Sequence, residues 1–417
     1  MTACSSQLTW ISMVTESTWA ENSTSTSSQI VIPHNGRADV SKLTQAMIDS
    51  ARAKQYRNEV PTGIVGPMAG AEFTFQMYIV GHGTTTSGAT TATDFENTMA
   101  WIIGAGVVTA ASGTTIAGVS TVTSLNTTSS GQFAPGGLFR VGVKNDARAD
   151  GQWGVVDTCV TTTLVSETAF AAAPTTGTPD VVFSAYNAYT KETSCDMTSK
   201  RFFVRTADTQ WCLHGCFLKS YTISGYQPGE LPMIEVTVGV SWFEPISATF
   251  PDTTAPNWTT APVPVAAGQI WLQAYGTTTY PTSTIAAVRS CSISVTPGVA
   301  ILPTHAGVSP YQVVGGATRT PDAITASVVL DAGGVSANPT WWANWLTNAR
   351  WHLLAGLSTA PGAAVACYLP NLTYTGNRPT QIDSDGLNRV QVDFKAGTDT
   401  AETASELSLS SMRWGFA

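Results

Sequence analysis

The sequence predicts a mainly β protein, a β-sandwich with flanking helices, and three observations support this prediction. Charged residues make up only 12% of the 417 residues, whereas Gly occurs 36 times and Pro 22 times. The stretch Phe217–Glu244 contains two alternating strands joined by a turn. A second version of this strand pair occurs at Leu369–Ala396, near the other end of the chain.

The second strand of each pair has one apolar and one polar face. The apolar residues are Ile234, Val236 and Val238 in the first copy, and Val390, Val392 and Phe394 in the second. The polar residues beside them are Glu235, Thr237 and Ser241 in the first copy, and Arg389, Gln391, Asp393 and Lys395 in the second. A sheet of this kind covers a core on one side and meets water on the other. We therefore expect these polar residues to form a solvated sheet face.

The first half of the chain predicts a further strand and two helices. Glu72–Val80 alternates strictly between apolar and polar residues. A short helix is predicted over Thr93–Ala105, where Thr93 and Glu96 fit a capping box. Another helix is predicted over Asp39–Tyr56, with Asp39 as its N-cap. Other expected elements are strands at Gln29–Pro33, Leu138–Val143, Cys159–Val165, Val181–Ala185 and Lys200–Val204, a Thr/Ser-rich arm to Ser28, and loops or hairpins over Val107–Gly137 and Pro174–Pro179.

Glycines and prolines interrupt the chain before Glu72. Pro61, Gly63, Gly66, Pro67 and Gly70 predict a loop in this segment. Because the connection is long and irregular, we expect it to reach beyond its own domain.

The second half repeats the order of the first in a shorter form. Its predicted elements are strands at Val288–Val295, Ile324–Leu330 and Val365–Tyr368, a Gly/Pro-rich loop over Thr296–Pro321, and a capped helix over Asn338–Gly356. This order predicts a duplicated domain, with a first unit at 1–245, a Pro/Thr-rich linker or arm at 246–284 that contains one strand at Gln269–Tyr275, and a second unit at 285–417.

Charge and hydropathy exclude several classes of protein. The formal net charge is −8 and no basic cluster occurs, which argues against a protein that grips nucleic acid through its phosphates. No apolar run approaches the length of about 18 residues needed to cross a membrane, and we expect no signal peptide. The low charge favours a surface that is covered by neighbouring subunits.

Cysteine usage predicts reduced thiols. The seven cysteines are scattered and odd in number, so no disulfide framework is expected. Cys212, His214 and Cys216 would share one face of a strand and could suggest a metal site. No second ligand pair follows, so structural thiols are favoured and no metal or cofactor is expected.

No motif for catalysis is present, and the chain is not expected to be an enzyme. His82 lies between two glycines, where a packing role is favoured over a site role. Asp383 and Asp385 resemble the start of a calcium loop, but a plain turn is favoured. Trp341, Trp342, Trp345 and Trp351 could form a sugar platform, although core and subunit contacts are favoured.

Several stretches resemble the tail tube proteins of long-tailed bacteriophages. Between Thr9 and Gly106 these are NGRADVSKLTQAMIDSARAKQYRN, PTGIVGPMAGAEFTFQMYIVGHGTT and FENTMAWIIGAG. The stretch FLKSYTISGYQPGELPMIEVTVGVSWFE resembles the strand pair of the tube wall in that family. The resemblance covers most of the chain.

The resemblance implies a structural protein of the virion tail, assembled in the host bacterial cytoplasm. Its strands would join a ring-shaped β-barrel, and the rings would stack into a channel for DNA, which passes without specific binding. A chain with two units implies trimeric rings with pseudo-sixfold symmetry, or hexameric rings if the second unit is incomplete. The implied partners are the tape measure, tail terminator and baseplate proteins.

The resemblance also suggests roles for two sets of residues. The predicted polar-face residues, Glu235, Thr237, Ser241, Arg389, Gln391, Asp393 and Lys395, would face the lumen. The loop with Pro61, Gly63, Gly66, Pro67 and Gly70 would contact the next ring. The alternatives are a phage capsid or decoration protein, and a carbohydrate-binding or hydrolytic β-protein.

Overall fold

The computed structural model describes most of the chain. The described residues are 9–21, 30–32, 34–44, 47–49, 63–65, 70–83, 92–108, 114–128, 133–142, 152–171, 173–174, 181–206, 209–224, 229–246, 262, 265, 270–279, 288–304, 312, 314–331, 337–358, 362–384, 387–399 and 405–417. They form a mainly β structure with large antiparallel sheets, as the sequence predicts.

The larger sheet contains two sets of strands. The first set is β1 (Thr9–Thr15), β3 (His34–Asp39), β6 (Glu72–Tyr78), β15 (Lys200–Thr206), β16 (Thr209–Ser224), β17 (Met233–Gly239) and β18 (Trp242–Pro245), with helix α1 (Asp94–Ile103) after β6. The second set is β19 (Ile270–Ala274), β20 (Val288–Pro303), β21 (Val314–Asp331), β22 (Trp351–Ser358), β23 (Val365–Tyr374), β25 (Leu387–Gly397) and β26 (Arg413–Phe416), with helix α2 (Ala337–Leu346) after β21.

The two sets pair in the same way. In the first set the antiparallel pairs are β1–β15, β3–β6, β6–β17, β15–β16, β16–β17 and β16–β18. In the second set they are β19–β22, β20–β21, β21–β25, β22–β23, β23–β25 and β23–β26. Each strand of the first set therefore has a counterpart with equivalent partners in the second.

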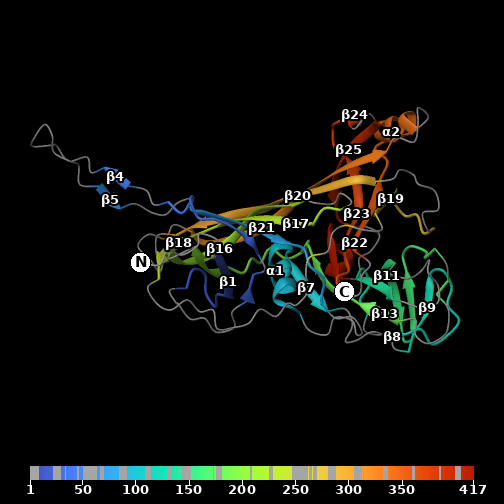
Figure 1. The fold of residues 1–417 in the computed structure, drawn as a ribbon, viewed down its shortest axis with the longest axis horizontal. Helices are drawn as coiled ribbons and strands as arrows, with labels where there is room; N and C mark the ends of the chain where they lie inside the picture. The colour runs from blue at the N-terminus through green and yellow to red at the C-terminus, as the bar shows by residue number, and fades with distance from the viewer. Residues whose placement is uncertain are drawn as a thin grey trace, which may run out of the picture.

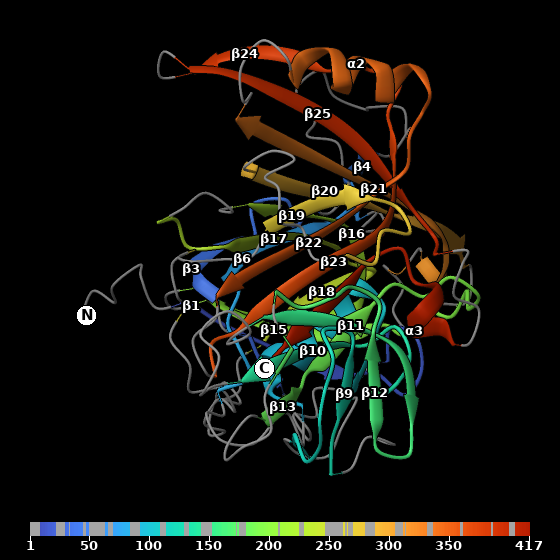
Figure 2. The same ribbon diagram turned by 90° about the vertical axis from the view of Figure 1, so that its right-hand side faces the viewer.

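One ladder joins the two sets edge to edge. β16 pairs with β20 through Tyr221 opposite Val295, Thr222 opposite Ser294, and Ile223 opposite Ile293. The order β3–β6–β17–β16–β20–β21–β25–β23 is therefore continuous across both sets. Figure 2 shows these strands between α2 and a smaller sheet, which is described next. The described strands of one chain do not close into a barrel.

A second, smaller sheet lies between α1 and β15 in the sequence. Its strand order is β8 (Thr114–Thr115), β13 (Val181–Ser184), β10 (Leu138–Gly142), β11 (Trp153–Val160), β12 (Thr163–Ser166) and β9 (Ser124–Asn126). It has a core of its own around Phe139, Leu164 and Phe170. In Figure 1 this sheet lies at the opposite end of the molecule from the hairpin of β4 (Met47–Asp49) and β5 (Gly63–Val65).

The remaining elements are β2 (Ile30–Val31), β7 (Ala105–Val108), β14 (Tyr186–Tyr189), β24 (Thr380–Ser384) and α3 (Glu406–Leu409).

One hydrophobic cluster underlies both sets. It includes Phe75 of β6, Val236 of β17 and Phe394 of β25, none more than 1% exposed. Helix α1 closes one side of this core, because Phe95 packs edge-on against Phe416 with ring centroids 5.4 Å apart. Its capping box is confirmed, since Thr93 Oγ1 accepts from the Glu96 amide at 3.2 Å and Glu96 Oε2 accepts from the Thr93 amide at 2.7 Å.

The predicted helix over Asp39–Tyr56 is wrong in the part that the structure describes. Asp39 ends β3, and its Oδ1 accepts from the Ser41 amide at 2.8 Å in a local turn. Residues 47–49 form β4, and 50–62 lie outside the described residues. β3 pairs with β6, and this tertiary pairing outweighs the helical spacing of the apolar residues.

The predicted helix over Asn338–Gly356 is too long. α2 ends at Leu346, Asn348 adopts φ 49°, and β22 begins at Trp351. Both faces of β22 are buried, since Leu353 and Leu354 are each 0% exposed. A strand buried on both faces has no polar alternation, so its sequence resembles that of a helix.

Other segments contain more strand than the sequence predicts. The expected loop over Thr296–Pro321 is largely a hairpin, because β20 and β21 stay paired from Gly298–Thr320 to Pro303–Val314. Pro297 lies at a register shift, where a missing amide hydrogen is tolerated. The single strand predicted at Cys159–Val165 is wrong, because this segment is the hairpin that joins β11 to β12 and turns at Thr161 with φ 52°. The predicted N-terminal arm contains β1, and Val107–Gly137 contributes to β7, β8 and β9.

Candidate functional site

A row of polar side chains crosses seven strands of the larger sheet, from β6 to β23. Its members are successive cross-strand partners, Gln76, Glu235, Thr222, Ser294, Thr325, Lys395 and Thr373. Cross-strand partners in an antiparallel sheet point to the same side. A parallel row contains Ser292, Ser327 and Asp393. We call this surface the polar face.

The opposite side of the same strands is buried. Phe75, Val236, Ile293, Ala326 and Phe394 are each at most 1% exposed. The alternation inferred from single strands therefore holds across both sets. Since burial of these residues fixes the register, a shift of one residue would turn the polar face into the core.

Glu235 and Asp393 occupy equivalent places in the two sets. Glu235 of β17 lies opposite Gln76 of β6, and Asp393 of β25 lies opposite Ser327 of β21. Gln76 Nε2 donates to Glu235 Oε2 at 2.5 Å, and Ser327 Oγ donates to Asp393 Oδ1 at 2.7 Å. Each set thus fixes one carboxylate at the same position.

Five of the seven residues predicted for this surface lie on the polar face. These are Glu235, Thr237, Gln391, Asp393 and Lys395, which are partly or fully exposed. Arg389 shares their side by register, but it is 6% exposed and its Nε lies 3.0 Å from Asp331 Oδ1. It contributes little to the surface of the polar face.

The prediction for Ser241 is wrong. This residue follows the end of β17, is 0% exposed, and its Oγ donates to the Gly215 carbonyl at 2.9 Å. The strand ends at Gly239, so the alternation that placed Ser241 beside Glu235 does not reach it.

The sequence-based set omitted polar residues of five other strands. They are Gln76 of β6, Thr222 of β16, Ser294 of β20, Thr325 and Ser327 of β21, and Thr373 of β23. The alternation of these strands could have found them, since each lies between two buried apolar residues. Their membership of one face depends on pairing between distant strands.

Only part of the predicted ring-contact loop is described. Pro61, Gly66 and Pro67 lie outside the described residues. Gly63 opens β5 opposite Asp49, and Gly70 is exposed with φ 81°, in a place where an added Cβ would meet no atom within 4 Å. The contact of this loop with another ring stays a prediction.

Cys212, His214 and Glu244 form a second polar cluster, away from the polar face. Their ligand atoms lie within 4.8 Å of one another. Cys216 does not join them, contrary to the expected shared face, because Gly215 adopts φ 60° and the register with β15 shifts there. Such a glycine bulge reverses the alternation of side chains, and Cys216 packs into the main core.

His82 has a structural role. It is buried, and its Nδ1 lies 2.7 Å from Oε1 of Glu96, the residue that completes the capping box of α1. The contact ties the segment after β6 to the start of the helix, in line with the favoured packing role.

The four tryptophans near α2 divide into two pairs. Trp341 and Trp351 are buried, with ring centroids 5.0 Å apart. Trp342 is 38% exposed and contacts Trp345, with centroids 6.0 Å apart. Two of the four tryptophans of the possible sugar platform, Trp341 and Trp351, therefore belong to the core. Asp385 lies outside the described residues, between β24 and β25.

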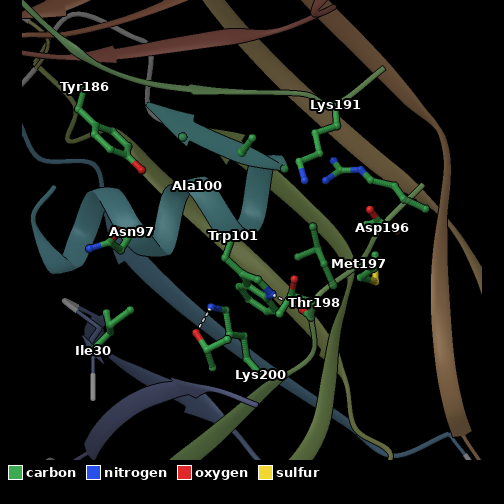
Figure 3. Close-up of a pocket in the computed structure, with 16 residues that line it drawn as sticks. Ile30, Asn97, Ala100, Trp101, Tyr186, Lys191, Asp196, Met197, Thr198 and Lys200 are labelled. Atoms are coloured by element: carbon green, nitrogen blue, oxygen red, sulfur yellow. Dashed lines mark hydrogen bonds between the residues drawn. The ribbon is translucent and has the colours of Figure 1, made fainter. Parts of the chain in front are cut away.

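A cavity of about 400 Å³ lies beside α1. Trp101 from the helix lies next to Thr198 and Lys200 on the facing wall, as Figure 3 shows. Lys200 Nζ donates to Thr15 Oγ1 at 2.6 Å, and Arg319 Nη2 donates to Asp322 Oδ2 at 2.6 Å. Burial lowers the pKa of Lys200. These internal contacts favour packing over anion binding.

Comparisons with known proteins give no family assignment. No family model matches the chain, and no curated protein matches its sequence. Within the described part of the chain, no helix has the length and apolarity needed to cross a lipid bilayer.

Proposed function

We propose that this chain is a structural virion protein, the major tail tube subunit of a long-tailed bacteriophage. It would polymerise as stacked rings into a channel for viral DNA, without catalysis. The observation that carries the proposal is the polar face, which is formed twice per chain with the same strand pairings. Assembly in the host cytoplasm, and contacts with tape measure, terminator and baseplate proteins, belong to the same proposal.

The junction inside the chain supports a mode of ring closure. Thr222 of β16 lies opposite Ser294 of β20. By the repeated pairings, Thr375 after β23 is equivalent to Thr222, and Asp39 of β3 is equivalent to Ser294. The ladders of the described residues give β3 one partner, β6. The edge beside Thr375 would therefore pair with Asp39 of the next copy.

This pairing favours trimeric rings. Each chain supplies two sheet units, so three chains would give the pseudo-sixfold ring. Closure of the sheet in this way would remove its open edges, which otherwise promote uncontrolled aggregation. Hexameric rings of whole chains remain the alternative.

The polar face would line the lumen. It combines hydroxyl and amide groups with the acidic Glu235 and Asp393 and the basic Lys395. A surface without a cluster of arginines or lysines has no means of holding phosphates by counterion release. DNA could therefore slide along it.

Cysteine pairs at the proposed junction test the ring. Cross-strand partners have Cα atoms about 4.5–5.5 Å apart, close enough for a disulfide. In assembled Asp39→Cys/Thr375→Cys protein, oxidation should link chains into a ladder that ends at the trimer on a non-reducing gel. Asp39→Cys/Gln381→Cys is the matched control, because Gln381 is exposed on β24, away from this edge. Assembled tubes without cross-links in the first variant would refute the junction.

Arginine substitutions test the lumen. Glu235→Arg combined with Asp393→Arg would add phosphate contacts along the channel. We expect normal tubes on negative-stain images but impaired DNA ejection. Glu230→Arg, at an exposed position outside β17, is the control. Unchanged infectivity of the double variant would count against a lumenal polar face.

Negative-stain images also separate the alternatives. A spherical shell would favour a capsid or decoration protein. Glycan binding by a monomeric preparation would favour a carbohydrate-binding protein.

A further inference from the structure

Strand pairing brings three possible metal ligands together at one end of β16. Cys212 and His214 are two residues apart on β16, and Glu244 lies on β18 directly opposite Cys212. The Cys212 sulfur, a ring nitrogen of His214 and a carboxylate oxygen of Glu244 all lie within 4.8 Å of one another. Ligands at two positions of one strand and one of its neighbour converge on a single point, as a metal site requires.

The hydrogen bonds of His214 fix its tautomer. Nδ1 lies 2.9 Å from the backbone carbonyl oxygen of Glu21, which can only accept, so Nδ1 carries the proton. In the neutral ring Nε2 then presents its lone pair, and it faces Glu244 Oε1 at 3.3 Å. An outer hydrogen bond to a carbonyl is the usual support of a metal-binding histidine.

The surroundings hold the imidazole in place. The ring of His214 stacks on Trp242, with centroids 3.8 Å apart and planes 2° apart, and both His214 and Cys212 are 0% exposed. With Nδ1 donating to the Glu21 carbonyl, Nε2 and Glu244 Oε1 face each other as two electron-pair donors, and a cation between them would satisfy both.

We propose that Cys212, His214 and Glu244 bind one Zn²⁺ ion. A thiolate, an imidazole and a carboxylate are the ligand types that zinc accepts, and three protein ligands leave the fourth tetrahedral position to water. Binding releases the thiol proton of Cys212 to solvent, since the thiolate is the ligand. Burial raises the pKa of this thiol, and the positive charge of Arg201 opposes the effect.

Zinc would fasten β18 to β16 beside the Gly215 bulge. The second set has no counterpart, because Ala366, Tyr368 and Gly415 occupy the equivalent positions. The site is therefore independent of the duplicated polar face and of the proposed tube function.

Metal analysis of the whole chain tests the site. After incubation with Zn²⁺ and gel filtration, wild-type protein should retain one zinc per chain and show a raised Tm that a chelator reverses. Co²⁺ should give the thiolate charge-transfer band of a tetrahedral site. Cys212→Ser should abolish the band, and Cys291→Ser, at another buried cysteine, should keep it.

A milder variant covers the case in which Cys212→Ser fails to fold. The Glu244 side chain is 38% exposed, so Glu244→Gln should fold and bind zinc about tenfold or more weakly. Wild-type protein that retains no stoichiometric zinc and gives no cobalt band would overturn the proposal, as would unchanged zinc affinity in Glu244→Gln.

Discussion

The two strand sets share their pairings and differ in the length of the segment after the helix. In the first set, residues 104–199 between α1 and β15 include the six-stranded sheet with its own core. In the second set, only residues 347–350 separate α2 from β22. Both sets nevertheless place a carboxylate, Glu235 or Asp393, at the same point of the polar face. The polar face therefore depends on the strands and their register, and tolerates a large insertion after the helix.

The largest expected effect tests whether the two sets share one core. Phe75 and Phe394, one from each set, belong to the same hydrophobic cluster. Phe75→Ala and Phe394→Ala should each lower the free energy of unfolding by about 3–5 kcal/mol, because each leaves a cavity. We expect both to shift the same calorimetric transition.

Two transitions, each sensitive to one variant, would contradict a shared core. That outcome would favour independent domains, as predicted at 1–245 and 285–417. Val119→Ala serves as a control, since Val119 is 83% exposed and its truncation should change stability by less than about 0.5 kcal/mol.

A smaller effect concerns the point at which one long strand of each set, β16 or β23, changes the strand with which it pairs. β16 passes from β18 to β17 at Gly215 and Cys216, and β23 passes from β26 to β25 at Leu369 and Pro370. Gly215 has φ 60°, and a Cβ there would lie 2.5 Å from Ser241 Oγ. Gly215→Ala should cost about 2 kcal/mol or more, from left-handed strain and the clash.

The matched change in the second set should cost less. Pro370→Ala leaves a residue that can adopt the φ of proline, so we expect about 1 kcal/mol. Urea denaturation of both variants measures the difference. An equal loss of stability would mean that the bulge is not the feature that distinguishes the two switch points.

The smallest effect concerns an ion pair that only the first set has. Glu72 contacts Lys219 and Lys42, whereas the equivalent position in the second set is Ala323. Hydrogen bonding to Lys219 is the main cause that lowers the pKa of Glu72 below 4.5. A lowered pKa means that folding stabilises the ionised form, so this stability is present above pH 4.5 and is lost as the pH falls through the folded value.

Glu72→Gln should therefore cost at most about 1 kcal/mol at pH 7, because the pair is partly exposed. Its difference from the wild type should vanish in acid, as measured by denaturation at a series of pH values. Glu230→Gln, at an exposed carboxylate, is the control. A difference that grows as the pH falls would contradict the assigned ion pair.

Patterns within single strands could be read from the sequence. The alternation in Glu72–Val80 predicted β6, and Thr93 with Glu96 predicted the start of α1. β22 could not be found in this way, because both of its faces are buried and Trp351 to Leu357 lacks polar alternation. The outer part of the β20–β21 hairpin could not be predicted, because its prolines interrupt the sequence pattern of a strand without ending the ladder of hydrogen bonds.

By itself, the sequence determined that the protein is mainly β, and that β17 and β25 each have a polar side with Glu235 or Asp393 on it. These properties depend on the period of two within a strand. Only the tertiary structure decided that the polar residues of seven strands share one face, that Ser241 lies outside it, and that Glu244 meets Cys212 and His214. Those contacts join residues far apart in the chain, and their register is fixed by the burial of a shared core.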